Sequence, residues 1–373
     1  GGRALAVIGP ANVTVEGLTL TGGNANGLGG IESSNGGGGV YLSGATATLT
    51  NCAVVTNVVT TAYGRGGGVA VNGGNVVIAN SRIAYNRAAD ADDYSAEYGG
   101  GLYAFGGTVN VVNSTLSDNS TRYGGGAYLT QNGIFTFTDN VIAHNTLAWD
   151  GNGGGVYLAQ GALHFAGNTV AANDKSGVVA QGDALWIADN TIRNQGEYAL
   201  SLTGAGVTVQ GNTLTANKQG VVINGSGLVA GNVISGCWGG TGLTLWGSAE
   251  QTAGQTFTVT GNLILHNTTT GDGGGVYARA YRVAFSNNVI AFNHANGNGS
   301  GLYLLPRGSG SGSDYTRYHY TLLHNTVNNN TGANGIYLRG PASFGPIQAE
   351  LKNNLIANHA VGGALGGAQY AWV

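Results

Sequence analysis

One acidic loop carries the densest charge of the chain and is the first candidate for chemistry. Asp90, Asp92 and Asp93 lie within four residues, and Glu97 follows them. Carboxylate oxygens at this density can hold calcium, with Asp118 of the next repeat as a further ligand. The spacing does not match a recognisable calcium loop, and an isolated acidic loop is usually solvated. Calcium is therefore one of two interpretations of this loop, and the sequence indicates no other cofactor.

A catalytic interpretation would use the same loop, residues 90–97, together with Arg122 or Asp150. Acid–base chemistry on a glycosidic bond needs two carboxyl groups held about 5–9.5 Å apart. A long loop holds such a distance less well than a strand does. No histidine has a serine or cysteine partner at a recognisable motif spacing. We therefore expect no catalytic residues, with a carbohydrate-active lyase or hydrolase as the alternative.

A row of tyrosines forms the second candidate site. Aliphatic residues flank each tyrosine and should face a core, so the tyrosine side chains should point outward. Such a row is typical of exposed strands, where tyrosine stacks on itself. It would also suit a binding platform for sugar rings or for a partner protein. The row comprises Tyr41, Tyr103, Tyr128, Tyr157, Tyr277, Tyr303 and Tyr337.

Asparagines recur at one further position in most repeats. Asparagine tolerates left-handed backbone angles, and its amide can bond to the same amide one repeat later. The buried polar groups of the backbone at this corner need hydrogen-bond partners in every repeat. We therefore interpret the row as a structural ladder and not as a ligand site. It comprises Asn57, Asn86, Asn119, Asn145, Asn173, Asn217, Asn267, Asn293 and Asn330.

These candidate residues lie in a unit that repeats about thirteen times. Asn168, Asn190 and Asn212 occupy one equivalent position of the repeat. In every copy the residue two positions after it is apolar, as in Val170, Ile192 and Leu214. Polar and apolar residues alternate around it, which predicts short strands with one buried face. Parallel strands without crossover helices can pair only by coiling around one axis. The sequence therefore predicts an all-β, right-handed parallel β-helix, a single-stranded solenoid of about 13 coils with three short strands per coil.

We expect residues 1–373 to form a single β-helix domain, either a segment of a longer solenoid or a filament subunit. Longer loops leave one corner at residues 58–66, 87–98, 120–123, 146–152 and 268–272, and should form one irregular wall. Cys52 and Cys237 lie seven coils apart, too far for a disulfide, so both should be free thiols.

Composition excludes several kinds of partner. The net charge is -3, so there is no basic surface for nucleic acid. No apolar run is long enough for a membrane-spanning helix. The polar surface is rich in asparagine and glycine and poor in lysine, which favours an extracellular or cell-surface setting for a secreted protein.

Two motifs carry a family resemblance: Gly-Gly-[Val/Ala/Leu]-[Tyr/Ala] and Phe-x-[Asn/Asp/Gly]-Asn, as in residues 137–140 and 285–288. They resemble the repeats of polymorphic outer-membrane and related bacterial surface proteins of the pectate-lyase-like superfamily. The resemblance implies a secreted or surface-displayed bacterial passenger, often adhesive, with no catalytic residues to carry over. The paired aspartates that the superfamily's polygalacturonases share on adjacent turns are not found here.

The sequence thus favours a non-enzymatic extracellular β-helix that acts as a rigid surface rod, an adhesive passenger or a filament subunit. Strand-like sequence begins near residue 6 and continues to residue 373, from which we predict that copies associate end to end. The other expected partners are glycans or the surface of a host or neighbouring cell. The alternative is a polysaccharide-binding module or a carbohydrate-active enzyme.

Overall fold

The computed structural model describes residues 2–32, 34–88, 96–247, 256–306, 319–339, 347–359, 363, 365–367 and 371–372. All regular elements within these residues are strands, which confirms the all-β prediction. The chain divides into two compact units, unit 1 (Gly1–Glu197) and unit 2 (Tyr198–Val373). Each unit is described by itself.

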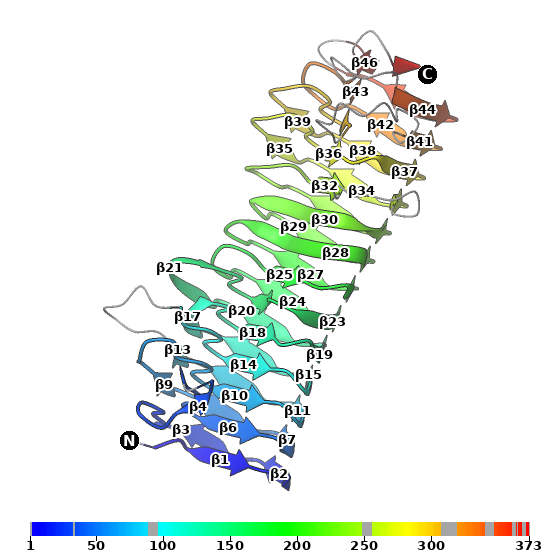
Figure 1. Cartoon of the computed structure of the whole chain (residues 1–373). Helices are drawn as coiled ribbons and strands as arrows, with labels where there is room; N and C mark the ends of the chain where they lie inside the picture. Colours follow the sequence, from blue (N-terminus) through cyan, green and yellow to red (C-terminus); the bar gives the residue numbers. More distant parts are fainter. Residues whose placement is uncertain are drawn as a thin grey trace. The chain divides into compact units, whose positions relative to one another are not determined.

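Unit 1 is a stack of coils whose strands form three parallel columns (Figure 1). Column one contains β1 (Leu5–Ile8), β6 (Val40–Ser43), β10 (Val69–Asn72), β14 (Leu102–Phe105), β18 (Ala127–Thr130), β22 (Val156–Leu158) and β25 (Val178–Gln181). Column two contains β2 (Asn12–Glu16), β7 (Thr46–Thr50), β11 (Asn75–Ala79), β15 (Thr108–Val112), β19 (Gly133–Thr138), β23 (Gly161–Ala166) and β26 (Ala184–Ala188). Column three contains β3 (Thr19–Thr21), β8 (Ala53–Val55), β12 (Arg82–Ala84), β16 (Thr115–Ser117), β20 (Val141–Ala143), β24 (Thr169–Ala171) and β27 (Thr191–Arg193).

Unit 2 repeats the same three columns. Two long strands, β28 (Tyr198–Gln210) and β30 (Gln219–Ala230), run through columns one and two. Column one continues in β32 (Leu243–Gly247), β36 (Val276–Arg279), β40 (Leu302–Leu305), β43 (Ile336–Leu338) and β46 (Leu365–Gly367), and column two in β33 (Phe257–Thr260), β37 (Arg282–Ser286), β41 (His319–Leu323), β44 (Ile347–Lys352) and β47 (Ala371–Trp372). Column three contains β29 (Thr213–Thr215), β31 (Val233–Ser235), β34 (Leu263–Leu265), β38 (Val289–Ala291), β42 (Thr326–Asn328) and β45 (Leu355–Ala357).

The register stacks equivalent residues directly over one another. Val170 aligns with Ile192 in unit 1, and Leu214 aligns with Ile234 in unit 2. These four side chains are 0% exposed. Burying an aliphatic side chain of this size stabilises a fold by roughly 1.5–3 kcal/mol. A continuous apolar interior of this kind, built coil by coil, confirms the predicted parallel β-helix.

The predicted irregular wall of unit 1 is wrong, because its loops pair with one another. They form a fourth parallel column, in which Arg87 aligns with Val58 on one side and with Ser120 on the other. A two-stranded antiparallel hairpin lies one coil before the first of these loops. The fourth column is β9 (Val58–Val59), β13 (Arg87–Ala88), β17 (Ser120–Tyr123) and β21 (Thr146–Asn152), and the hairpin is β4 (Gly30–Ile31) with β5 (Ser34–Asn35). In unit 2 the equivalent strands are β35 (Thr268–Thr269) and β39 (His294–Ala295).

Two corners of the coil use left-handed backbone angles. The corner after column two uses residue types that accept such angles, for example Asn113 (φ 45°) and Asp139 (φ 56°). The corner after column three also places Thr56 (φ 54°), Tyr85 (φ 58°) and Ala172 (φ 51°) in this region. A side chain with a Cβ costs roughly 1–2 kcal/mol there, so the second corner carries backbone strain.

Relief of this strain is testable at Ala172. We expect Ala172→Gly to raise the free energy of unfolding by about 0.5–1 kcal/mol, because glycine adopts the left-handed angle without a Cβ clash. Urea unfolding measures the change. The neighbouring Ala171→Gly is the matched control, since Ala171 is a buried strand residue and its replacement should destabilise the protein. Equal destabilisation by both changes would contradict the strain at this corner.

Candidate functional site

The predicted asparagine ladder lies at the corner after column three. Asn145 donates from Nδ2 to Leu116 O (2.9 Å) and to Asn173 Oδ1 (2.9 Å). Its own Oδ1 accepts from the backbone N of Asn119 (3.1 Å) and from Asn119 Nδ2 (3.0 Å). Asn145 is 0% exposed. Each such amide is thus used in joining three successive coils, which favours the structural interpretation over a ligand site.

A second ladder, at the corner after column two, was not recognised in the sequence as a hydrogen-bonded row. Asn140 Nδ2 donates to Asn168 Oδ1, and Asn232 Nδ2 donates to Asn262 Oδ1. Near the start of the chain Cys52, Ser81 and Ser114 occupy the same position, and Ser81 Oγ accepts from Cys52 N. The sequence could have revealed this second ladder, because asparagine occurs at its position in as many repeats as at the position of the first ladder.

Several tyrosines of the predicted outward row are buried, so an exposed platform along the whole row is wrong. Tyr41 is 5% exposed, Tyr103 is 3% exposed and Tyr303 is 1% exposed, whereas Tyr128, Tyr157, Tyr277 and Tyr337 are half-buried. The side chains leave the coil as expected, but in unit 1 other segments cover them. Tyr41 and Tyr103 form a buried cluster with Ile31 of the β4–β5 hairpin.

Arginines from the loop side complete the cover in unit 1. The guanidinium of Arg3 lies 4.4 Å from the ring centroid of Tyr41, and that of Arg65 lies 5.4 Å from the ring centroid of Tyr103. Arg65 also pairs with Glu32 (2.8 Å). Cation–π contacts of this kind are stronger when they are desolvated. The rings of this part of the row therefore serve the packing of the fourth column and hairpin against column one.

Ring stacking limits what the tyrosine row can bind. Tyr128 stacks on Tyr103 (centroids 5.6 Å apart, 4° between planes) and on Tyr157 (5.2 Å, 3°). In unit 2, Tyr303 stacks on Tyr277 (5.2 Å) and on Tyr337 (5.5 Å). A ring with a neighbour on each face offers a ligand only its edge and hydroxyl group. The middle of each row therefore cannot act as a stacking platform for sugars.

A glycine four residues before most tyrosines of the row makes this packing possible. Gly153 has φ +68°, and a Cβ on it would lie 2.8 Å from Tyr157 Cβ. Gly273 has φ +69°, and a Cβ on it would lie 2.9 Å from Tyr277 Cβ. The glycine that directly precedes the Gly-Gly-x-Tyr motif in these two coils is thus required by the close approach between the corner and the tyrosine Cβ.

Several phenol groups of the row have raised pKa values. Burial raises the pKa of Tyr103 and of Tyr128 well above the usual value of a phenol, and nearby tyrosines raise that of Tyr128 further. Burial also raises the pKa of Tyr277 and Tyr303. A neutral phenol donates a hydrogen bond but does not accept a proton as a general base. These tyrosines are therefore suited to packing and binding.

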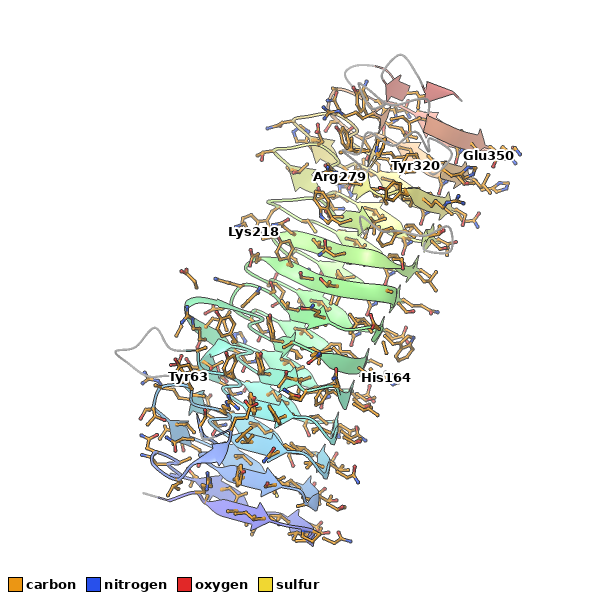
Figure 2. All side chains as sticks on the ribbon, in the orientation of Figure 1. Tyr63, His164, Lys218, Arg279, Tyr320 and Glu350 are labelled. Carbon is orange, nitrogen blue, oxygen red and sulfur yellow. The ribbon has the colours of Figure 1, made fainter. Side chains whose placement is uncertain are left out.

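One part of column one in unit 2 combines aromatic and cationic side chains on its outward face. We call it the aromatic–arginine strip, and it consists of Trp246, Tyr277, Arg279, Tyr303 and Arg339. Trp246 aligns with Arg279 in the next coil, and the guanidinium lies 5.9 Å from the indole ring centroid. Trp246 contacts Tyr277 at 5.3 Å between centroids, and Arg339 Nη1 donates to Tyr303 Oη (3.1 Å). Figure 2 labels Arg279 on the column-one strands.

The predicted calcium ligands Asp90, Asp92 and Asp93 lie outside the described residues. Among the residues that the structure does describe, no group of three or more His, Cys, Asp or Glu side chains could hold a metal ion. Of the other residues in the catalytic alternative, Glu97 is 1% exposed, Arg122 is half-buried and Asp150 is exposed.

Both cysteines are free, as predicted, and both are buried. Burial raises the pKa of the Cys237 thiol to about 12, which makes it a poor nucleophile. Within the part of the chain that the structure describes, there is no helix long and apolar enough to cross a membrane.

The ladder interpretation predicts a large effect for Asn145→Ala. This change leaves the buried backbone N–H of Asn119 without its acceptor, and it removes one acceptor of Asn119 Nδ2 and one donor to the carbonyl of Leu116. We expect the free energy of unfolding in urea to fall by about 3 kcal/mol, since each unsatisfied buried group costs about 1–3 kcal/mol. Asn75→Ala is the control, because Asn75 is exposed on β11 and its loss should change stability by less than about 0.5 kcal/mol. Similar losses for the two variants would contradict the ladder role.

The raised tyrosine pKa values predict a loss of stability in alkali. Unfolded tyrosines ionise near pH 10, whereas Tyr103 and Tyr128 stay neutral in the fold well above it. The unfolded state then binds fewer protons than the native state, so stability falls as the pH rises above about 10. Urea midpoints and phenolate absorbance against pH measure this. Tyr128→Phe should flatten the dependence, and an unchanged pH profile in that variant would count against the burial of this phenol.

Comparison with known proteins identifies the fold. A family model described as a right-handed β-helix region matches residues 3–192 and 180–371. A crystal structure of a double mutant of the periplasmic alginate epimerase AlgG is similar, with a TM-score of 0.52 and 13% identity over 85% of this chain and 76% of that one. A structure of AlgG without these substitutions has a TM-score of 0.48 and 15% identity, covering 85% and 76%. The Dettilon tailspike protein has a TM-score of 0.33 and 14% identity, covering 97% and 61%.

The comparison with curated proteins gives no match. At these identities the structural likeness concerns the fold alone. The family match spans most of the sequence in two overlapping segments and agrees with the coiled parallel strands of each unit. The chain belongs to the right-handed β-helix family.

Proposed function

We propose that this chain is a polysaccharide-binding β-helix and that the aromatic–arginine strip of unit 2 binds an acidic polysaccharide. The main observation behind this proposal is that Trp246 aligns with Arg279 on the outward face of column one, where Trp246 also contacts Tyr277. An aromatic surface beside a guanidinium provides a contact for a sugar ring and a bidentate partner for its carboxylate.

Arg279 is half-buried, so part of its guanidinium group faces solvent. Its Nε is buried and has no hydrogen-bond partner among the described residues. A buried N–H left without a partner costs about 1–3 kcal/mol, so a ligand oxygen would offset that cost only if the side chain turned its Nε toward the ligand. The guanidinium lies over the indole of Trp246, which holds it in one orientation.

The aromatic–arginine strip ends at Trp246, because the coil before it carries smaller side chains at the same positions. Asn224 occupies the position of Trp246 in the preceding coil, and Val222 occupies that of Thr244. Smaller residues therefore lie on the side of Trp246 that faces away from Tyr277. The acidic side chain near the tyrosines, Asp272, accepts a hydrogen bond from Asn298 N (2.7 Å). Two arginines against one aspartate leave the strip with a positive balance, which suits an anionic polymer.

The comparisons support the substrate class of this proposal. AlgG is named as an alginate epimerase, and alginate is an acidic polysaccharide. We extend the proposal to an extracellular setting in which the β-helix acts as a surface rod that holds a glycan, with end-to-end association of copies as a further part of it. A lyase or hydrolase activity is the second candidate, favoured by the fold that the chain shares with AlgG.

The test is equilibrium binding of alginate and polygalacturonate by titration calorimetry. We expect Trp246→Ala and Arg279→Ala each to weaken binding about tenfold, the size of one lost stacking or charged contact. Arg282→Ala is the matched control, because it removes the same charge from column two of the same coil. Binding that all three changes weaken equally would show a non-specific charge effect. Absence of binding to either polymer would refute the proposal, and depolymerisation during the titration would favour the enzyme.

A further inference from the structure

The fourth column of unit 1 ends at β21, whose last residue is Asn152 (Figure 1). In the coil before it, the glycine at this corner donates to the column strand of the next coil, since Gly124 N donates to Asn152 O (3.1 Å). The coil after β21 has only four residues between Asn173 and Val178 and adds no strand to the column. Gly153, the equivalent glycine of the β21 coil, therefore has no carbonyl of a following strand to donate to.

The side chain of Asn152 takes the place of that carbonyl. Gly153 N donates to Asn152 Oδ1 (2.8 Å), so the amide group folds back onto the backbone nitrogen that follows it in the chain. The amide carbon Cγ lies one C=O bond, about 1.2 Å, from Oδ1. A nucleophilic nitrogen and an electrophilic carbon are thus held next to each other, which is the condition for a near-attack geometry.

We infer that Asn152–Gly153 is a site of spontaneous deamidation. Gly153 N attacks Asn152 Cγ, the N–Cγ bond forms and the Cγ–Nδ2 bond breaks. The amide nitrogen leaves as ammonia with the proton of Gly153 N, and a five-membered succinimide remains. Water then opens the ring, at Cγ to give aspartate or at the backbone carbonyl carbon to give isoaspartate. Water is the only co-reactant, and it reaches Asn152 because this residue is half-buried and not enclosed.

The residue after Asn152 offers no steric resistance to ring closure. Gly153 has no Cβ, and the fold requires glycine at this position for a separate reason. A Cβ there would lie 2.8 Å from Tyr157 Cβ, at a backbone φ of +68°. The close approach of the tyrosine row therefore keeps next to Asn152 the residue type that least obstructs attack on its amide.

Two other Asn-Gly pairs of unit 1 have their amides tied to another segment. Asn26 Nδ2 donates to Thr60 Oγ1 (2.7 Å), and Asn26 Oδ1 accepts from Thr60 N (2.9 Å). Asn35 Nδ2 donates to Thr61 Oγ1 (2.7 Å), and Asn35 Oδ1 accepts from Gly29 N (2.9 Å). Neither amide can turn toward its following glycine without losing both bonds. These two pairs are therefore controls within the same molecule.

The two products would affect the end of the fourth column differently. Aspartate keeps an oxygen that can accept from Gly153 N, and it adds a negative charge to the coil that follows Arg122. Isoaspartate places an extra methylene group in the main chain of β21. That insertion shifts the carbonyl of residue 152, which accepts from Gly124 N, and so loosens the pairing of β21 with β17.

The test incubates the whole chain in mildly alkaline buffer and maps deamidation by peptide mass spectrometry and isoaspartyl methyltransferase labelling. We expect Asn152 of the native protein to react about tenfold faster than Asn26 and Asn35, because only its amide is positioned for attack. In urea the three rates should become similar. A native rate at Asn152 that does not exceed the two control rates overturns the inference. Reaction at the exposed Asn132, which also precedes a glycine, with Asn152 intact overturns it too.

A variant assigns the released ammonia to this residue. Asn152→Gln keeps an amide oxygen near Gly153 N, but its extra methylene group replaces the five-membered ring closure by a slower six-membered one. We expect the fast phase of ammonia release from the native chain to slow about tenfold in this variant, with Asn26 and Asn35 unchanged. A urea midpoint like that of the parent shows that the variant is folded. A fast phase that persists in the folded variant places the reaction elsewhere and overturns the inference.

Discussion

The structure depends on the need to satisfy buried polar groups at each corner of the coil. An asparagine such as Asn119 donates to the carbonyl of Ile83 in the coil before it and to Asn145 Oδ1 in the coil after it. Its amide is 0% exposed, so water cannot replace these partners. Each coil therefore fixes the position of the next one, and residues of the same kind must follow one another along the stack.

This strict stacking decides where a ligand can bind. A continuous row of rings, such as Tyr103, Tyr128 and Tyr157, uses its own faces for packing. Open ring faces arise where a row is interrupted by a small residue. Asn224 interrupts the row before Trp246. Binding sites on a β-helix of this kind are thus expected at irregularities of the repeat and not at its most regular positions.

The sequence predicted the fold well because apolar residues such as Val170 and Ile192 recur at a fixed position in every repeat. The closing ladder followed from the same regularity. The burial of Tyr41 and Tyr103 could not be predicted, because alternation within a strand shows which way a side chain points and not what covers it. Their cover comes from Arg3 and Arg65, which lie outside those strands. The fourth column was missed because loops of unequal length gave no common period.

Stacking also limits how charge can be arranged. Like charges at the same position in adjacent coils repel each other directly. In the aromatic–arginine strip Arg279 aligns with Leu305, and Arg339 follows Leu338, which aligns with Leu304. The backbones of the two arginines are therefore two coils apart, or about 9.6 Å at 4.8 Å per coil. The guanidinium group of Arg339 reaches back to Tyr303 Oη in the coil between them, so side-chain length brings the two cations nearer than their backbones without placing like charges at the same position of adjacent coils.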